Sequence, residues 1–313
     1  MTNYDLIIVG GGISGMTAAL SSLKKGIDNI LLIERESTLG GLLNQFIHNG
    51  YGKKVSKNLL TGPEYVYHVE KRIKKYNIDI KLDTEVLNVS DEKEVTYVNQ
   101  REGIQTVQGK AIILSTGCRE KFTGSITIPV DKYLGIYTIG SAQRLINIQG
   151  ILPGKNPVVV ANSKWAFEVA RRLVIEGSQI QGLIIEKRDD IDLLKKYHEI
   201  IDEFDIPIIE EAEIKAVLGE DRVTGIKVRL NDNKEKTIKC DSLILSVGYF
   251  PEIEVLENPE IDDNTKSIKV NNYRTNIDGI FACGNLIYGM KTLDIDKEID
   301  GTKLGDIIFE YLK

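Results

Sequence analysis

Cysteine is scarce in this 313-residue chain, which contains three cysteines and three histidines. Cys118, Cys240 and Cys283 lie far apart, and no CxxC pair occurs. The sequence therefore supports neither a disulfide framework nor a dithiol redox centre, and the few scattered histidines do not form a zinc motif. We expect a protein of a reducing compartment, with a cytoplasmic location and without a metal site.

Long hydrophobic runs and blocks of like charge are also missing. No apolar stretch reaches the roughly 18 to 20 residues of a membrane-spanning helix, so no membrane span is predicted. The N-terminal residues lead directly into a strand pattern without a basic segment or cleavage site, so no signal peptide is expected. Lys and Arg total 40 and Asp and Glu total 46, a net charge of −6 without a strong basic block. This balance argues against nucleic acid as a partner.

What the chain does contain is the composition of an ordinary folded protein. Hydrophobic residues make up 42% and charged residues 27% of the sequence. These values exclude disordered, collagen-like and low-complexity classes, and the length is sufficient for about two domains.

The most informative segment lies at the N-terminus. Residues 5–9 (DLIIV) form a short apolar run typical of a buried parallel strand, and GGGISG follows from Gly10 to Gly15. A helix pattern comes next, and a second apolar run over 30–33 ends at Glu34. Strand, glycine turn, helix, strand and acidic residue is the order of a dinucleotide-binding βαβ unit.

Each position in this turn has a physical role in binding a pyrophosphate. Gly10 permits the tight turn, Gly12 lets the backbone approach the phosphates, and Gly15 permits close packing of helix on strand. The helix N-terminus offers free N–H groups and a partial positive charge. Glu34 can accept hydrogen bonds from a ribose diol. We predict dinucleotide binding here; the alternative is a glycine-rich loop without a ligand.

A second unit of the same layout has an altered turn. The strand pattern over 157–161 is followed by an amphipathic helix pattern and by another strand pattern that ends at Glu186. The glycine positions are now occupied by Ala161, Ser163 and Ala166. Ala is tolerated at the third position, but the Ser163 side chain stands where a pyrophosphate would touch the backbone. Binding of a nicotinamide nucleotide here, with Glu186 at its ribose, is left open.

Three segments in this order carry a resemblance to a known family. They are VGGGISG with Glu34, ILSTG at 113–117 and GIFACGN at 279–285. Together they resemble the two-dinucleotide-binding-domain flavoproteins of the pyridine nucleotide-disulfide oxidoreductase superfamily. The resemblance implies an α/β fold of two Rossmann-like domains, with FAD as a cofactor and NAD(P)H as a second candidate.

The same resemblance implies the domain boundaries. Residues 1–116 and 248–313 would form a discontinuous FAD-binding domain, and residues 117–247 an inserted NAD(P)-binding-like domain with a degenerate glycine motif. Shorter segments, among them GGLLNQFIHNGYG at 40–52 and TGCREK at 116–121, are similar to a narrower group. That group is the FAD/NAD-dependent oxidoreductases associated with anaerobic glycerol-3-phosphate dehydrogenases and sarcosine or opine oxidase alpha subunits.

Candidate site residues follow from these motifs. His48 is the candidate catalytic group because a histidine titrates near neutral pH, with a structural or exposed histidine as the alternative. The residues that the motifs and the resemblance assign to FAD are Gly10, Gly12, Ser14, Gly15, Glu34, Arg35, Gly41, Leu42, Val86, Thr116, Gly117, Gly284 and Asn285.

The leading functional hypothesis is an FAD-dependent oxidoreductase without a redox-active disulfide. Its flavin would accept a hydride from NAD(P)H or a small organic donor and pass electrons to an acceptor, either a small molecule or a protein. The alternative is an FAD-binding electron-transfer subunit of a dehydrogenase complex that no longer binds a nicotinamide nucleotide; a third hypothesis is a flavin-binding scaffold without turnover. A homodimer or a partner dehydrogenase subunit is the expected assembly.

Overall fold

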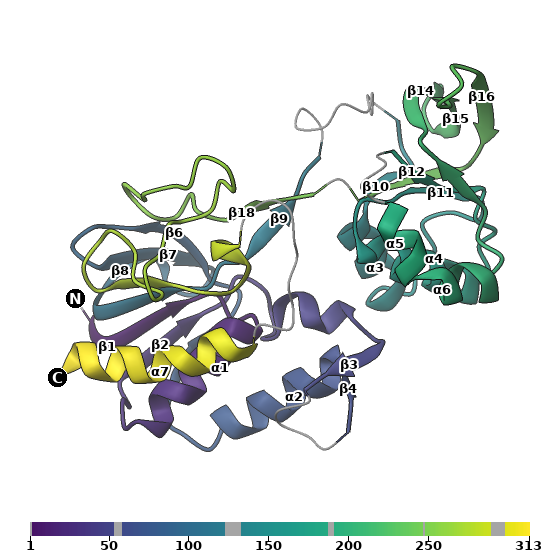
Figure 1. Cartoon of the computed structure of the whole chain (residues 1–313). Helices are drawn as coiled ribbons and strands as arrows, with labels where there is room; N and C mark the ends of the chain where they lie inside the picture. The colour runs from purple at the N-terminus through teal and green to yellow at the C-terminus, as the bar shows by residue number, and fades with distance from the viewer. Residues whose placement is uncertain (1, 53–57, 123–132, 187–190, 247, 289–297) are drawn as a thin grey trace. The chain divides into compact units, whose positions relative to one another are not determined.

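The structure of the protein is a computed structural model (Figure 1). It describes residues 2–52, 58–122, 133–186, 191–246, 248–288 and 298–313. It divides into two compact units. Unit 1 comprises Met1–Arg119 with Tyr249–Lys313, and unit 2 comprises Glu120–Gly248. Each unit contains a parallel sheet with helices, so the predicted α/β fold with two Rossmann-like domains is confirmed.

Unit 1 is built on a seven-stranded sheet in the order β5-β2-β1-β8-β7-β6, with β19 also paired to β8. Strands β5, β2, β1, β8 and β19 are parallel, whereas β6 and β7 form an antiparallel extension. Val9 lies between Ile33 and Leu114, so the central strands end at one edge. The strands are β1 (Thr2–Val9), β2 (Ile30–Ile33), β5 (Asp79–Lys81), β6 (Glu85–Val89), β7 (Glu94–Asn99), β8 (Gly103–Leu114) and β19 (Ile280–Ala282).

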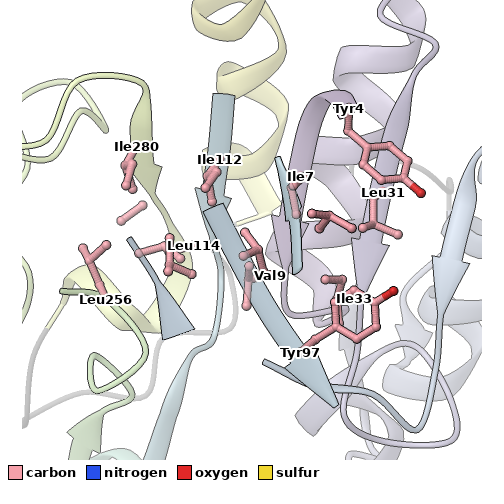
Figure 2. Close-up of a cluster of buried hydrophobic side chains, with 14 of the residues drawn as sticks. Tyr4, Ile7, Val9, Leu31, Ile33, Tyr97, Ile112, Leu114, Leu256 and Ile280 are labelled. Carbon is pink, nitrogen blue, oxygen red and sulfur yellow. The ribbon is translucent and has the colours of Figure 1, made fainter. Parts of the chain in front are cut away.

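Side chains from the parallel strands and the antiparallel extension share one hydrophobic core (Figure 2). Ile7 and Val9 of β1 are buried in it, and the ring of Tyr97 on β7 lies beside Ile33 of β2. The apolar runs over 5–9 and 30–33, predicted as strands, contribute Ile7, Val9, Leu31 and Ile33 to this core. Its burial fixes the register of the strands and therefore the position of the turns at their ends.

The helices of unit 1 include a closely packed pair, α1 (Ile13–Lys24) and α7 (Glu298–Leu312). A Cβ at Gly305 of α7 would lie 2.6 Å from the backbone carbon of Ser21 on α1, so only glycine fits there. The Ser21 hydroxyl donates to the Thr302 carbonyl at 2.6 Å. The other elements of this part are η1 (Gly41–Gln45), β3 (Asn49–Tyr51), β4 (Leu60–Thr61), α2 (Gly62–Ile73) and η3 (Gly284–Ile287).

Unit 2 contains a five-stranded parallel sheet in the order β10-β17-β11-β12-β13 and a three-stranded antiparallel sheet, β14-β15-β16. The parallel strands are β10 (Ile136–Thr138), β11 (Pro157–Val160), β12 (Gly182–Ile185), β13 (Ile208–Glu210) and β17 (Ser242–Leu245). The antiparallel strands are β14 (Glu213–Gly219), β15 (Val223–Arg229) and β16 (Glu235–Lys239). The helices are α3 (Ile139–Asn147), α4 (Lys164–Ile175), α5 (Ile191–Lys196) and α6 (His198–Glu203).

Two short paired strands, β9 (Cys118–Glu120) and β18 (Tyr249–Pro251), lie where the chain passes between the units. In the described part of the chain, no helix is both long enough and apolar enough to cross a membrane.

Candidate functional site

The glycine turn connects β1 to α1 at the carboxyl edge of the unit 1 sheet. Gly10 has a φ of +102°, and a Cβ there would lie 2.8 Å from the backbone carbon of Ser115. A Cβ on Gly15 would lie 2.6 Å from the Ser115 hydroxyl oxygen, whereas a Cβ on Gly12 would meet no atom within 4 Å. The chain itself therefore requires glycine at 10 and 15. At Gly12 the space beside the helix N-terminus is open, which fits the phosphate position that the motif predicts.

Glu34 closes this turn from the neighbouring strand. Its Oε2 atom accepts the Gly11 N–H at 2.7 Å, and Oε1 accepts the Glu36 N–H at 2.9 Å. The side chain is buried. Each carboxylate oxygen has a further lone pair, so these bonds leave capacity for a ribose hydroxyl. Glu34 thus holds the turn together, and its predicted ribose contact stays a prediction.

Two segments from elsewhere in unit 1 lie against the same turn. Gly40 forms a parallel β-bridge with Gly12, and a Cβ on Gly41 would lie 3.2 Å from the Gly12 Cα. Gly284, with a φ of +71°, begins η3, and a Cβ there would lie 2.6 Å from the Ser14 hydroxyl oxygen. Predicted site residues from three distant parts of the sequence are therefore neighbours; Leu42 and Asn285 follow them directly in the chain.

Ser115 is a residue of this turn that the sequence motifs did not single out. Its hydroxyl lies 3.0 Å from the Val9 carbonyl oxygen and 2.8 Å from that of Gly10, and it donates to these acceptors. The end of β8 is thereby attached to the end of β1. The only signal in the sequence is the serine of ILSTG, which lies between the apolar run and the residues chosen from that motif.

The next two residues, Thr116 and Gly117, contact the segment after β18. The Thr116 hydroxyl donates to the Glu252 carbonyl at 2.6 Å, and the Glu252 N–H donates to the Gly117 carbonyl at 3.0 Å. Arg35 also approaches this residue, with its Nη1 atom 3.9 Å from Glu252 Oε1. These contacts place three predicted FAD residues around Glu252.

Val86 lies close to the Glu34 end of the turn. The Thr84 N–H donates to the Glu34 carbonyl at 3.0 Å, and the Asp83 N–H donates to the Glu36 carbonyl at 3.1 Å. Val86 follows at the start of β6, where its side chain packs against the core. Its backbone therefore belongs to the segment beside the expected adenosine position.

His48 lies between η1 and β3, among aromatic side chains. Its Nε2 atom is 2.8 Å from the Tyr51 hydroxyl oxygen, and its ring centroid is 5.9 Å from that of Phe46. A hydrogen-bonded histidine of this kind is compatible with a structural role, so its proton-handling role stays a prediction.

The corresponding turn of unit 2 is stabilised differently. Ser163 precedes α4 with a φ of −152°, an extended conformation that does not require glycine. Its hydroxyl lies 2.7 Å from that of Ser246, which in turn donates to Asn162 Oδ1 at 3.0 Å. Ser246 follows β17, the strand beside β11, so the Ser163 side chain turns towards the neighbouring strand of its own sheet. The Lys164 ammonium lies 4.6 Å from the centre of the buried Trp165 ring.

Glu120 is the notable titratable group of unit 2. Its carboxylate oxygens accept the Gly140 N–H at 2.9 and 3.0 Å, at the N-terminal end of α3. Burial raises the pKa of Glu120 above its ordinary value, although hydrogen bonds from Thr138 and the first backbone N–H groups of the helix oppose this effect. Among the residues that the structure describes, no group of His, Cys, Asp or Glu is arranged to hold a metal ion.

Residues 4–297 match the family described as pyridine nucleotide-disulphide oxidoreductase, and the chain therefore belongs to this family. The protein is therefore an FAD-dependent oxidoreductase. Its family membership, its two Rossmann-like units and the glycine turn between β1 and α1 agree in this respect.

Several known proteins are similar to the chain. A 34.2 kDa protein in the rubredoxin operon of Clostridium pasteurianum is 26% identical over 288 residues, which cover 90% of this chain and 88% of that protein. A subunit of alkyl hydroperoxide reductase in Staphylococcus aureus is 23% identical over 90% of this chain and 54% of its own length. NADH dehydrogenase of Bacillus subtilis is 23% identical over 90% of this chain and 53% of its own length. The chain thus spans about half the length of the latter two relatives.

Solved structures with the same fold include two reductases. Thioredoxin reductase of T. acidophilum superposes with a TM-score of 0.80 at 20% identity, covering 99% of both chains. Bacillithiol disulfide reductase of Bacillus cereus gives 0.77 at 17% identity, again over 99% of both chains. At these identities the likeness concerns the fold alone.

Proposed function

We propose that residues 1–116 and 248–313 bind FAD at the turn between β1 and α1. The observation that carries this proposal is the open space at Gly12 beside the α1 N-terminus, with Glu34 on the adjoining strand. FAD, when bound, supplies the two-electron redox chemistry of its isoalloxazine ring. The chain's own residues supply binding, orientation and electrostatics.

Different groups of residues would contact different parts of FAD. Gly10, Gly12, Ser14 and Gly15 would hold the pyrophosphate, and Glu34 the adenosine ribose. Gly41 and Leu42 would lie along the phosphates and ribityl chain, and Thr116, Gly117, Gly284 and Asn285 would complete the site. The contacts of Gly41 with Gly12 and of Gly284 with Ser14 support this division, because they bring the separate segments to one turn.

Electron transfer by this protein would use no resident dithiol. The sequence has three cysteines and no CxxC, and burial raises the pKa of Cys240 to about 12, which keeps that thiol protonated. The electrons would therefore pass directly to a small-molecule or protein acceptor.

Residues 117–247 would bind the electron donor, a nicotinamide nucleotide, at the turn before α4. The hydrogen bond between Ser163 and Ser246 supports this role, because it turns the Ser163 side chain towards β17. Glu186, which follows β12, would accept hydrogen bonds from the ribose.

The second candidate is an FAD-binding electron-transfer subunit of a dehydrogenase complex. The observation in its favour is that Ser163 occupies the central glycine position of the second motif. The resemblance of segments 40–52 and 116–121 to proteins associated with glycerol-3-phosphate dehydrogenases and sarcosine oxidases also favours a partner subunit, in the cytoplasm.

An anaerobic titration distinguishes the two candidates. The purified protein is mixed with NADH and then with NADPH, and the flavin band near ~450 nm is followed. We expect rapid bleaching by at least one of the two nucleotides. A yellow protein that neither nucleotide bleaches would support the electron-transfer subunit instead. A colourless protein that takes up no added FAD would contradict the flavin site itself.

A further inference from the structure

A group of polar side chains lies beside the expected adenosine end of the site, outside the motifs that predicted it. We call it the Glu102 network, and it consists of Lys81, Thr84, Tyr97, Asn99 and Glu102. The Lys81 ammonium donates to both Glu102 carboxylate oxygens, at 2.9 and 2.8 Å. Glu102 Oε2 also accepts from Asn99 Nδ2 at 2.9 Å and from the Tyr97 hydroxyl at 3.2 Å. Hydrogen bonds from Lys81 and Asn99 lower the pKa of Glu102 below its ordinary value.

The network is joined to the segment before β6 through Thr84. Asn99 Nδ2 donates to the Thr84 hydroxyl at 3.3 Å, and this hydroxyl donates to the Leu82 carbonyl at 2.8 Å. Thr84 is 1% exposed. The backbone N–H of Thr84 donates to the Glu34 carbonyl at 3.0 Å, and the Glu34 N–H donates to the Lys81 carbonyl at 2.8 Å. Two residues of the network, Lys81 and Thr84, are therefore hydrogen-bonded through their backbones to Glu34, the residue expected at the ribose.

Tyr97 anchors the network to the hydrophobic core. Its ring lies beside Ile33 in the core of unit 1 (Figure 2). Its hydroxyl donates to Glu102 Oε2. In the antiparallel pairing of β6 with β7, Tyr97 lies directly opposite Val86. The anchored Tyr97 is thus the cross-strand neighbour of Val86, whose backbone is expected to contact the adenine.

We propose that the Glu102 network positions the backbone of residues 83–86 for the adenine ring of FAD, with Glu102 as the central positioning residue. The inference rests on the proposed FAD site at the glycine turn. The segment needs such support because Asp83 has a φ of +48°, which residues other than glycine adopt infrequently. A segment held in place before binding loses less conformational entropy when the ligand arrives, and affinity rises accordingly.

The test compares FAD with FMN, which lacks the AMP portion of the cofactor, that is, the adenosine and one of the two phosphates. The full chain is freed of flavin and titrated with each compound, and binding is followed by quenching of flavin fluorescence. For Glu102→Gln we expect FAD affinity to fall about three- to ten-fold, since several charge-assisted hydrogen bonds are weakened, with FMN affinity unchanged. The matched control is Glu260→Gln, which removes a surface ion pair in which Glu260 Oε1 lies 2.9 Å from the Lys269 ammonium. We expect this variant to leave the affinities for FAD and FMN unchanged.

A second variant covers the case in which Glu102→Gln does not fold. Thr84→Val keeps the side-chain shape and removes the hydroxyl that joins the network to the segment, so the same selective loss of FAD affinity is expected. Equal losses for FAD and FMN would overturn the inference, because they would indicate general structural support. Unchanged FAD affinity in both variants would also overturn it. Parent protein that binds neither flavin would instead overturn the proposed function.

Discussion

Gly12 is a position at which the fold would accept a side chain but the expected cofactor would not. A Cβ there meets no atom within 4 Å, and its φ of −65° is one that every residue can adopt. Gly15 differs, because a Cβ at that position would collide with the Gly10 carbonyl. Gly10 and Gly15 are thus required by the chain itself, whereas glycine at position 12 would be required by the ligand.

Gly12→Val should therefore leave the protein folded and abolish flavin retention, because the new side chain would occupy the pyrophosphate position. The ratio of flavin to protein absorbance after purification should fall at least about ten-fold, with the melting temperature within a few degrees of that of the flavin-free parent. Gly15→Val is the comparison, and it should destabilise the protein itself. A Gly12→Val protein as yellow as the parent would contradict the assignment of this turn.

At the scale of helices and strands, the elements with strong local signals were predictable. The βαβ order ending at Glu34 combines β-branched runs, a glycine turn and an acidic residue, all close in sequence. The hydrogen bonds of Ser115 and the Glu102 network could not be predicted from the sequence. They join residues that are distant in the chain, and they depend on how the strands pair. The start of α2 at Gly62 is a further example, because Leu60 and Thr61 pair with β3 directly before the helix.

The contact between α1 and α7 gives a prediction about stability. Gly305→Val should lower the free energy of unfolding by about 2 kcal/mol or more, because the side chain would press on the Ser21 backbone. Lys303→Ala, an exposed substitution two residues away on α7, should change it by less than about 0.5 kcal/mol. Urea unfolding measures both, and equal stabilities for the two variants would show that the helices can separate at little cost.

At the scale of the whole molecule, the two units can be followed separately because Trp165 is the only tryptophan and lies in unit 2. Its side chain is buried, so its emission should change when that unit unfolds. Glu120 belongs to the same unit, and its raised pKa makes unit 2 sensitive to pH.

The direction of this pH dependence follows from linkage. Since folding raises the pKa of Glu120, the folded state retains a proton that the unfolded state has released, and the Glu120 contribution to stability falls as pH rises above about 4.5. Glu120→Gln should remove this contribution, so its stability relative to the parent should increase with pH. Urea unfolding followed by Trp165 emission, at a series of pH values above about 4, measures the difference. A difference that does not vary with pH would contradict the assignment.

The discontinuity of unit 1 also has a consequence for the order of events during synthesis. Helix α1 is translated before unit 2, whereas its partner α7 and the Gly284 segment beside Ser14 are translated after it. Unit 2 is continuous and can fold while the chain is still growing. The turn between β1 and α1 therefore gains its last contacts only after the whole of unit 2 has been translated.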